Sequence, residues 1–214
     1  MFELIFKGAL DTLYMTFLST ALAYLFGLPI GIALVVTDKD GITPVYVLNK
    51  TLGVIINLTR SVPFLILLIA VIPFTRFVVG KAIGTNATVV PLVIAAAPFI
   101  ARLVESSLKE VDRGVIEAAQ SIGASPMQII YKVMLPEAKP SLIVGGAIAI
   151  TTILSYSAMA GIVGGGGLGD IAIRYGYYRY QKGIMFVTVA LLVIIVHVFQ
   201  EVGMNIAKIS DKRN

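Results

Sequence analysis

The sequence predicts an all-α, polytopic membrane protein with about five transmembrane helices and a cytoplasmic helix–bend–helix loop. Two observations predict this class. The 214 residues are 57% hydrophobic and only 14% charged, with a mean hydropathy of +0.92, whereas about a quarter of the residues in a soluble domain are charged. Several uncharged runs are also long enough to cross a bilayer, which takes about 20 helical residues.

Each expected span rests on one apolar run. The uncharged runs are Thr12–Thr37, Ala82–Ala101, Pro140–Gly169 and Gly183–Gln200, and Arg60 alone interrupts Thr51–Thr75. We therefore expect a single transmembrane domain over residues 1–214, with spans at about 12–37, 51–75, 82–103, 140–163 and 183–203. Prolines inside spans predict bends, because neighbouring groups can satisfy the carbonyls that they free. These prolines are Pro63, Pro73, Pro91 and Pro98.

Small residues recur at every fourth position in two spans, which predicts close helix packing. The two ladders are Ala23-Gly27-Gly31 and Ser157-Gly161-Gly165-Gly169. The run Gly164–Gly169 also fits G-x-G-x-x-G. It follows an apolar helix rather than a strand of a βαβ unit, so it does not predict a dinucleotide site. We expect this run to end the fourth span and reverse the chain.

The distribution of Lys and Arg predicts the orientation, because basic residues concentrate on the cytoplasmic side. With five spans and the N-terminus outside, eleven basic residues fall on the inner side and six on the outer side. The inner residues are Lys39, Lys50, Arg60, Arg102, Lys109, Arg113, Lys132, Lys139, Lys208, Lys212 and Arg213, and the outer ones are Lys7, Arg76, Lys81, Arg174, Arg179 and Lys182. We therefore expect the N-terminus outside, and the C-terminus and the loop of residues 106–138 in the cytoplasm.

The composition argues against several other classes of protein. The chain has no cysteine and one histidine, and its carboxylates are scattered, so no metal site and no catalytic constellation is predicted. It also lacks the G-x-x-x-x-G-K-[ST] loop that cradles the phosphates of ATP. The net charge of +5 is explained by the basic cytoplasmic loops and requires no nucleic-acid partner. We expect no cofactor on this chain.

The stretch EAAQSIGASPMQIIYKVMLP, residues 117–136, interrupts this apolar chain. Asp112 is a plausible N-cap for a helix over residues 113–122, and Gly123 ends that helix because glycine adopts the left-handed conformation most easily. The first helix is narrow because two alanines follow Glu117. A narrow helix held outside the membrane suits a groove on another protein, although an ordinary interfacial loop is equally consistent with these features.

A second short helix follows the glycine. Ser125 is its expected N-cap, Pro126 occupies the first helical position and Gln128 the third, which together form a capping box. Leu135-Pro136 is expected to end this helix. The segment is therefore predicted to fold as helix, bend and helix.

The spacing of this segment resembles a family motif. Glu117-Ala118-Ala119, three residues, Gly123, nine residues, Val133, one residue and Leu135-Pro136 are similar to the EAA loop of binding-protein-dependent ABC importer permeases, with Val133 where the family usually has isoleucine. Three further stretches resemble the permease subunits of methionine importers, and the resemblance as a whole extends over most of the chain. They are RSVPFLILLIAVIPFTR (60–76), APFIARLVE (97–105) and SYSAMAGIVGGGGLGDIAIRYGYYRY (155–180).

This resemblance implies a type I ABC importer permease fold and a role in carrying methionine across the bacterial cytoplasmic membrane. It implies a homodimer, with the pathway at the two-fold axis, in contact with membrane lipid. The implied partners are two cytoplasmic ABC ATPase subunits, which would hydrolyse ATP in place of this chain, and an extracytoplasmic solute-binding protein.

The resemblance also assigns roles to individual residues. Glu117, Ala118, Ala119 and Gly123 correspond to the positions that couple the permease to its ATPase. The fourth span lines the pathway in the family, which makes Ser155, Tyr156 and Met159 candidates. Because methionine is flexible and fills irregular gaps, Met159 could close a gate, with ordinary helix packing as the alternative.

Other functions remain open. The same architecture could serve another amino acid or a small vitamin. A channel or an ion-coupled transporter would need no ATPase, but the spans lack paired midplane charges and visible inverted repeats. An assembly scaffold is a third possibility.

Overall fold

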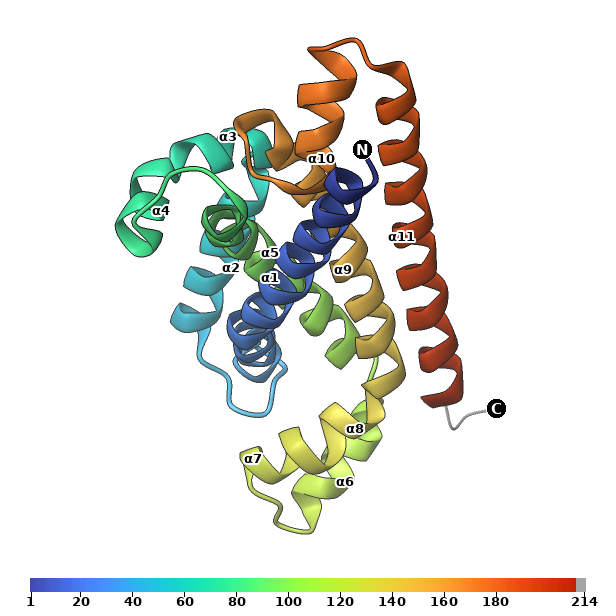
Figure 1. Ribbon diagram of the computed structural model, residues 1–214. Coiled ribbons are helices and arrows are strands. Elements are labelled where there is room, and N and C mark those ends of the chain that lie inside the picture. The colour runs from blue at the N-terminus through green and yellow to red at the C-terminus, as the bar shows by residue number, and fades with distance from the viewer. Residues whose placement is uncertain (211–214) are drawn as a thin grey trace.

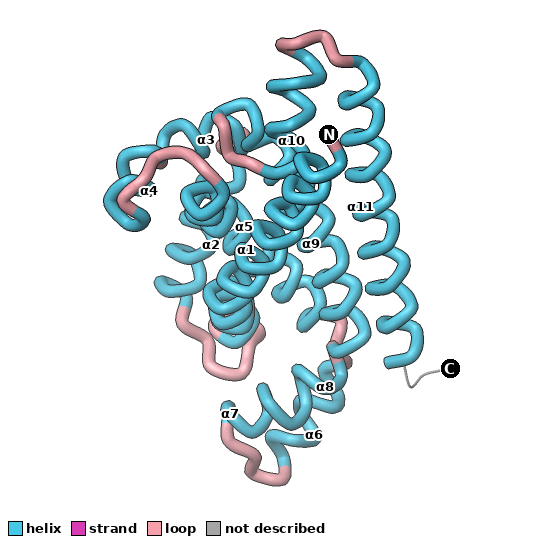
Figure 2. The backbone as a smooth tube through the Cα atoms, in the orientation of Figure 1, coloured by secondary structure: helices cyan, strands magenta, loops and turns pink. Residues whose placement is uncertain are grey.

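The computed structural model describes residues 1–210, which are helical without strands (Figure 2). The four long helices are α1 (Phe2–Val36), α5 (Thr85–Lys109), α9 (Lys139–Ala160) and α11 (Lys182–Ser210). The shorter α-helices are α2 (Tyr46–Ser61), α3 (Phe64–Ala70), α4 (Ile72–Val79), α6 (Arg113–Ser121), α7 (Pro126–Ile129), α8 (Leu135–Glu137) and α10 (Gly167–Ile171). Two π-helical segments, η1 (Ile130–Met134) and η3 (Ala172–Tyr177), and the 3-10 turn η2 (Gly161–Val163) connect them.

The apolar helices match the predicted class. Within residues 1–210, four helical stretches are long and apolar enough to cross a membrane, and a bent pair brings the number to five. The pair is α2 and α3, which meet at an angle of 100°. The run of residues 51–75 is thus not one straight helix. Pro63 separates the two helices in an extended conformation (φ −56°, ψ 136°), because its ring and missing N–H oppose helix continuation.

The other prolines divide into two groups. Pro73 lies in the first turn of α4, a position where its missing N–H costs nothing, so α3 and α4 are separate helices. Pro91 and Pro98 both lie inside α5, which is continuous over 25 residues. The predicted interruptions therefore occur at Pro63 and Pro73, whereas α5 carries its two prolines without a break.

The centre of the molecule is the crossing of α1 and α5 (Figure 1). Ala23 is fully buried. A Cβ atom on Gly27 would lie 2.8 Å from the carbonyl oxygen of Ala97, and one on Gly31 would lie 2.7 Å from that of Ala101. Real Cβ atoms do not approach this closely, so only glycine permits this helix spacing. The packing role predicted for the first small-residue ladder is confirmed.

The second small-residue ladder does not form a continuous helix face. Helix α9 ends at Ala160, and the chain turns at Gly164, Gly166 and Gly167, whose φ angles are +77°, +83° and +76°. The Thr88 hydroxyl on α5 secures this turn by donating to the carbonyl oxygen of Gly165 at 3.2 Å. The predicted break and reversal at residues 164–169 are confirmed, while the expected helix–helix ladder is replaced by a turn folded onto the end of α9.

The two ends of the molecule carry different segments (Figure 1). The N-terminus and the connection between η3 and α11 lie at one end. The loop of residues 37–45, helices α6 to α8 and the end of α11 lie at the other. This arrangement places the start of α1 and the end of α11 at opposite ends of the molecule, as an odd number of spans requires. Lys212 and Arg213, which contribute to the predicted basic excess, lie outside the described residues.

The second helix of the loop extends further than predicted. Helices α7 and α8 are joined by the π-helical η1, so the helical path continues past Pro136 to Glu137. A π turn widens the helix directly before Pro136, where the missing N–H interrupts the regular α-helical bonding. Leu135-Pro136 therefore changes the type of helix rather than ending it.

Candidate functional site

The loop between α5 and α9 has the predicted caps. Asp112 Oδ1 accepts a hydrogen bond of 2.6 Å from the Gly114 N–H at the start of α6. At the start of α7 the Gln128 N–H donates to Ser125 Oγ at 3.4 Å, and the Ser125 N–H donates to Gln128 Oε1 at 2.8 Å. These bonds satisfy N–H groups that have no partner within the helices. Both helices begin where the sequence predicts.

Gly123 forms the bend between the two helices. Its φ is +81°. Its N–H donates to the Gln120 carbonyl at 2.9 Å, and the Ala124 N–H donates to the Ala119 carbonyl at 3.1 Å, which is the pair of bonds that defines a Schellman motif. No atom lies within 4 Å of the Cβ that a larger residue would add. Glycine is therefore required here for its backbone conformation and not for space.

Helix α6 turns one face toward the protein. Ala119 is 8% exposed, and together with the half-buried Ile116 it belongs to the same apolar cluster as Ile129 and Met134 of the second helix. Small residues at position 119 allow the two short helices to pack closely. The loop is therefore a folded unit rather than a flexible connection.

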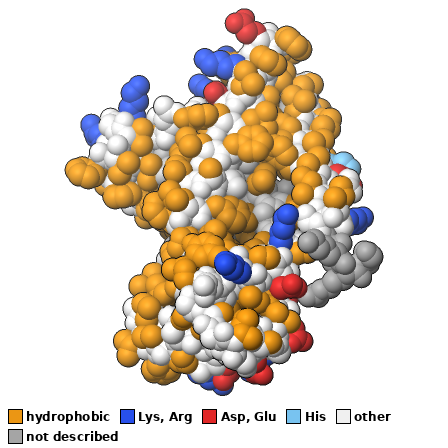
Figure 3. Space-filling model, turned by 90° about the horizontal axis from the view of Figure 1, so that it is seen from below, with side chains coloured by type: hydrophobic (Ala, Val, Ile, Leu, Met, Phe, Trp, Pro, Cys, Tyr) orange, Lys and Arg blue, Asp and Glu red, His pale blue; other side chains and the backbone are white. Residues whose placement is uncertain are grey.

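A second face of α6, next to the buried Ala119, carries exposed apolar residues. Val115 and Ile122 are 43% and 86% exposed, and Ala118 between them is also exposed. Their spacing places them on one helix face. We call Val115, Ala118 and Ile122 the docking face. Helix α6 lies at one end of the molecule (Figure 1), and the view from below shows apolar side chains exposed among charged ones (Figure 3). The docking face is therefore a candidate protein-binding surface.

Glu117 lies away from the docking face. It lines a cavity of about 440 Å³ between α6 and the end of α1, together with Asp38, Lys109 and Arg113. Sequence reasoning grouped Glu117, Ala118 and Ala119 as one coupling set. The structure distributes them over three environments: Glu117 borders the charged cavity, Ala118 is exposed and Ala119 is buried.

The three pathway candidates do not share one environment. Ser155 and Met159 are exposed on one face of α9, and Met159 is 48% exposed. The ring of Tyr156 instead stacks on that of Phe64 of α3, with centroids 4.5 Å apart and an interplanar angle of 3°. Tyr156 therefore fastens the bent pair α2–α3 to α9, and only Ser155 and Met159 face outward.

Sequence reasoning missed the full extent of this outward face. Ile148, Thr152, Ser155, Met159 and Ile162 follow one another at intervals of four, three, four and three residues. Ile148 and Ile162 are 44% and 51% exposed, and Thr152 is partly exposed. The alternation of three- and four-residue steps is the heptad spacing of helix–helix seams, and this pattern could have been found from the sequence. We call these five residues the α9 seam.

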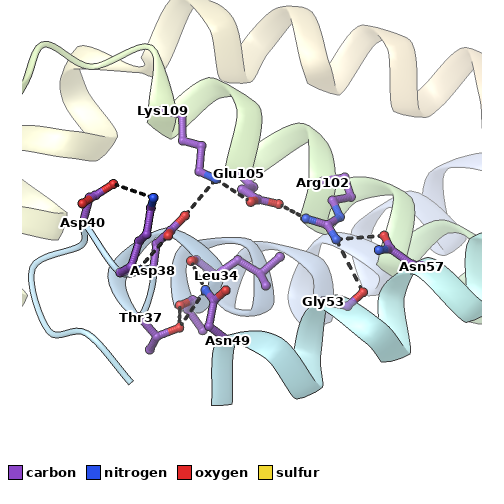
Figure 4. Close-up of polar contacts among 12 residues, drawn as sticks. Leu34, Thr37, Asp38, Asp40, Asn49, Gly53, Asn57, Arg102, Glu105 and Lys109 are labelled. Carbon is purple, nitrogen blue, oxygen red and sulfur yellow. Dashed lines mark hydrogen bonds and ion pairs between the residues drawn. The ribbon is translucent and has the colours of Figure 1, made fainter. Parts of the chain in front are cut away.

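A chain of polar contacts links α2, α5 and the loop of residues 37–45 (Figure 4). Arg102 pairs with Glu105 at 2.5 Å and also donates to Asn57 Oδ1 at 2.8 Å. Lys109 Nζ lies 2.9 Å from Glu105 Oε1 and 3.0 Å from Asp38 Oδ2. The hydrogen bond from Lys109 holds the pKa of Asp38 below its usual range.

Among residues 1–210 no group of three His, Asp or Glu side chains is arranged to hold a metal ion.

Comparison with known proteins agrees with this geometry. The family described as "Binding-protein-dependent transport system inner membrane component" matches residues 27–214. The chain belongs to this family. The permease is 49% identical to the "Probable D-methionine transport system permease protein MetI" of Vibrio cholerae, over 99% of this chain and 94% of that protein. It is 43% identical to the "Methionine import system permease protein MetP" of Bacillus subtilis, over 84% of this chain and 81% of that protein.

A solved structure extends the comparison to the fold. The permease matches a chain of the inward-facing MetNI methionine ABC transporter with a TM-score of 0.98 and 46% identity, over 99% of this chain and 98% of that chain. The permease is therefore a multi-pass membrane transport component with the type I importer fold, as its sequence predicts.

Proposed function

We propose that this permease is the membrane-spanning subunit of an ATP-driven importer that carries methionine into the bacterial cytoplasm. The observation that carries the proposal is the unit α6–Gly123–α7, a rigidly capped pair of helices outside the membrane that presents an exposed apolar face. Such a face needs a protein partner. The similarity to methionine permeases of Vibrio cholerae and Bacillus subtilis supports methionine as the solute.

The partner on the cytoplasmic side is a pair of ABC ATPase subunits. The permease sequence has no phosphate loop, so ATP is bound and hydrolysed on another chain. The docking face inserts into a groove of each ATPase, and Ala118 keeps that face narrow. Gly123 sets the angle of α6, and Glu117 acts from the cavity side rather than within the groove.

A second copy of the permease completes the pathway. The α9 seam is uncovered in the single chain, and its heptad spacing suits a partner helix across a two-fold axis. Ser155 and Met159 then line the pathway between the two copies. A solute-binding protein delivers methionine at the opposite end, where the N-terminus and the connection before α11 lie, and lipid surrounds the outer helices such as α11.

Reconstitution tests this function. The permease is purified with its ATPase, placed in vesicles and supplied with its solute-binding protein. We expect methionine to stimulate ATP hydrolysis and to accumulate with ATP, while other amino acids have smaller effects. Stimulation by a different solute would retain the importer and reject methionine, and accumulation without ATP would reject the importer.

A further inference from the structure

The cytoplasmic end contains two sets of ion pairs that meet at the loop of residues 37–45. One set runs from Asn57 of α2 through Arg102, Glu105 and Lys109 of α5 to Asp38. The other joins Asp40 to Arg113, the first residue of α6, at 3.6 Å, with side chains that are 51% and 74% exposed. Figure 4 shows the first set. We call this set, together with the Asp40–Arg113 pair, the ion-pair chain, which extends from α2 to the beginning of α6.

The inner part of this chain is held firmly. The side chains of Glu105 and Arg102 are 12% and 25% exposed. Charges that are largely removed from water must keep their partners. Glu105 is paired with both Arg102 and Lys109, so the loss of either cation leaves this poorly solvated carboxylate with a single partner.

The loop of residues 37–45 is fixed at its helical boundaries. Asn49 of α2 donates to the Leu34 carbonyl of α1 at 2.6 Å and to the Thr37 hydroxyl at 3.2 Å. The Thr43 N–H donates back to the Val36 carbonyl at 3.0 Å. A displacement of this loop must therefore be accompanied by a displacement of the ends of α1 and α2.

Three routes lead from α6 into the membrane. Two are covalent: the short connection to α5, and the path through α7, η1 and α8 to α9. The third runs from Arg113 to Asp40 and through the loop to α1 and α2, while Lys109 holds the same loop against α5 at Asp38. A cavity bordered by Glu117 lies between α6 and the end of α1.

We infer that the ion-pair chain positions α6 and transmits its displacement to α1 and α2, with Lys109 as the residue that joins the ion-pair route to α5. This inference rests on the proposed coupling of the permease to an ATPase. The ion-pair chain then affects more than stability, because it sets the amount of methionine that is carried per ATP hydrolysed.

The test uses the purified permease–ATPase complex with the binding protein. Lys109→Gln removes the charge that both Glu105 and Asp38 contact. We expect methionine carried per ATP hydrolysed to fall about three- to tenfold, which lies in the lower part of the range given by the coupling energies of contacting residues. Lys109→Arg retains the charge and can contact both carboxylates, so it should restore the ratio. Lys50→Gln is the matched control, because Lys50 is an exposed cation whose contact is with Tyr46 alone.

A double-mutant cycle isolates the contact itself. If Asp38 and Lys109 act through each other, Asp38→Asn combined with Lys109→Gln should be no worse than Lys109→Gln alone. A purely structural effect would lower the amount of assembled complex and leave the ratio unchanged. An unchanged ratio in assembled Lys109→Gln complexes, or full additivity in the cycle, overturns the inference.

A distance measurement separates this inference from the transport function. The chain has no cysteine, so spin labels can be placed at the exposed positions Thr43 and Gln120. We expect a narrow distance distribution in the complex and a broader one with Lys109→Gln. If the wild-type complex fails to transport methionine, the proposed substrate is wrong, while the label distances still decide the positioning role. Identical distance distributions in the wild-type and Lys109→Gln complexes would overturn the positioning role of the ion-pair chain.

Discussion

At the residue scale, Gly123 is the position where the backbone conformation alone determines the effect of a substitution. Its φ is +81° and the space around it is open, so a valine meets conformational strain and no clash. We expect Gly123→Val to cost about 1–2 kcal/mol in the docking geometry of α6, which corresponds to about tenfold weaker ATPase binding at each site. Co-purification of the ATPase with the inserted permease measures this loss.

Gly80 supplies the matched control for this prediction. It ends α4 with a φ of +77°, and no atom lies within 4 Å of its added Cβ. Gly80→Val therefore introduces the same strain at the opposite end of the molecule. We expect it to retain the ATPase.

Glu117→Gln should also be milder than Gly123→Val, because the backbone is unchanged and one exposed charge contributes about 0–1 kcal/mol. If Gly123→Val retains the ATPase and transports normally, the bend has no role in docking.

Asp38 gives a prediction for pH. The hydrogen bond from Lys109 lowers the pKa of Asp38 in the folded protein. Its contribution to stability is therefore present above the unfolded pKa of about 4 and is lost as the pH falls through the lower folded value. We expect the difference in thermal stability between wild type and Asp38→Asn to be constant from about pH 8 to pH 5. The difference should shrink below about pH 4, and a maximum in acid would contradict the pairing.

At the element scale, the α9 seam determines what Met159 does. Met159 and Ser155 are exposed in the single chain, so they are available to a second copy or to the pathway. If Met159 closes a gate, Met159→Ala should increase solute leak and basal ATP hydrolysis without preventing assembly. Met204→Ala is the control, because Met204 is 37% exposed on α11, the helix that we propose to face lipid. Leak and hydrolysis at wild-type levels would assign Met159 to packing.

The crossing of α1 and α5 makes a second prediction at this scale. A Cβ on Gly31 would lie 2.6 Å from the Val104 side chain, so Gly31→Val forces the helices apart. Overpacking of this kind costs about 1–3 kcal/mol. Thermal unfolding in detergent should show the loss, and Gly183→Val should not, because the space at Gly183 is open. Equal melting temperatures for the two variants would show that the crossing can relax.

At the scale of the whole molecule, the orientation in the membrane can be tested directly. The loop of residues 37–45 lies at the end with α6, and the connection before α11 lies at the other end (Figure 1). Thr43 and Gln181 are exposed in these two segments. We expect an impermeant thiol reagent to label Gln181→Cys in intact cells, and Thr43→Cys only after the membrane is opened. The reverse labelling would invert the assigned orientation.

The sequence alone determined the membrane class, the approximate number of spans and the capped helix–bend–helix unit. These features depend on local properties. An apolar run long enough to span the bilayer forms a helix because lipid offers its backbone no other partners, and Gly123 takes its conformation because glycine lacks a Cβ. The caps at Asp112 and Ser125 follow from contacts within three residues.

The tertiary structure decided what depends on neighbours distant in the chain. Pro63 produces a 100° bend while Pro91 does not interrupt α5, because tolerance of a membrane proline depends on the groups packed around it. Tyr156 is separated from the pathway face by its stacking on Phe64. Lys109 can hold the loop of residues 37–45 only because the end of α1 places Asp38 Oδ2 3.0 Å from Lys109 Nζ. The sequence determines the chemistry of each side chain, whereas the tertiary structure determines which groups surround it. For this reason only the structure could show that Glu117 borders the cavity and that Ala118 lies on the docking face.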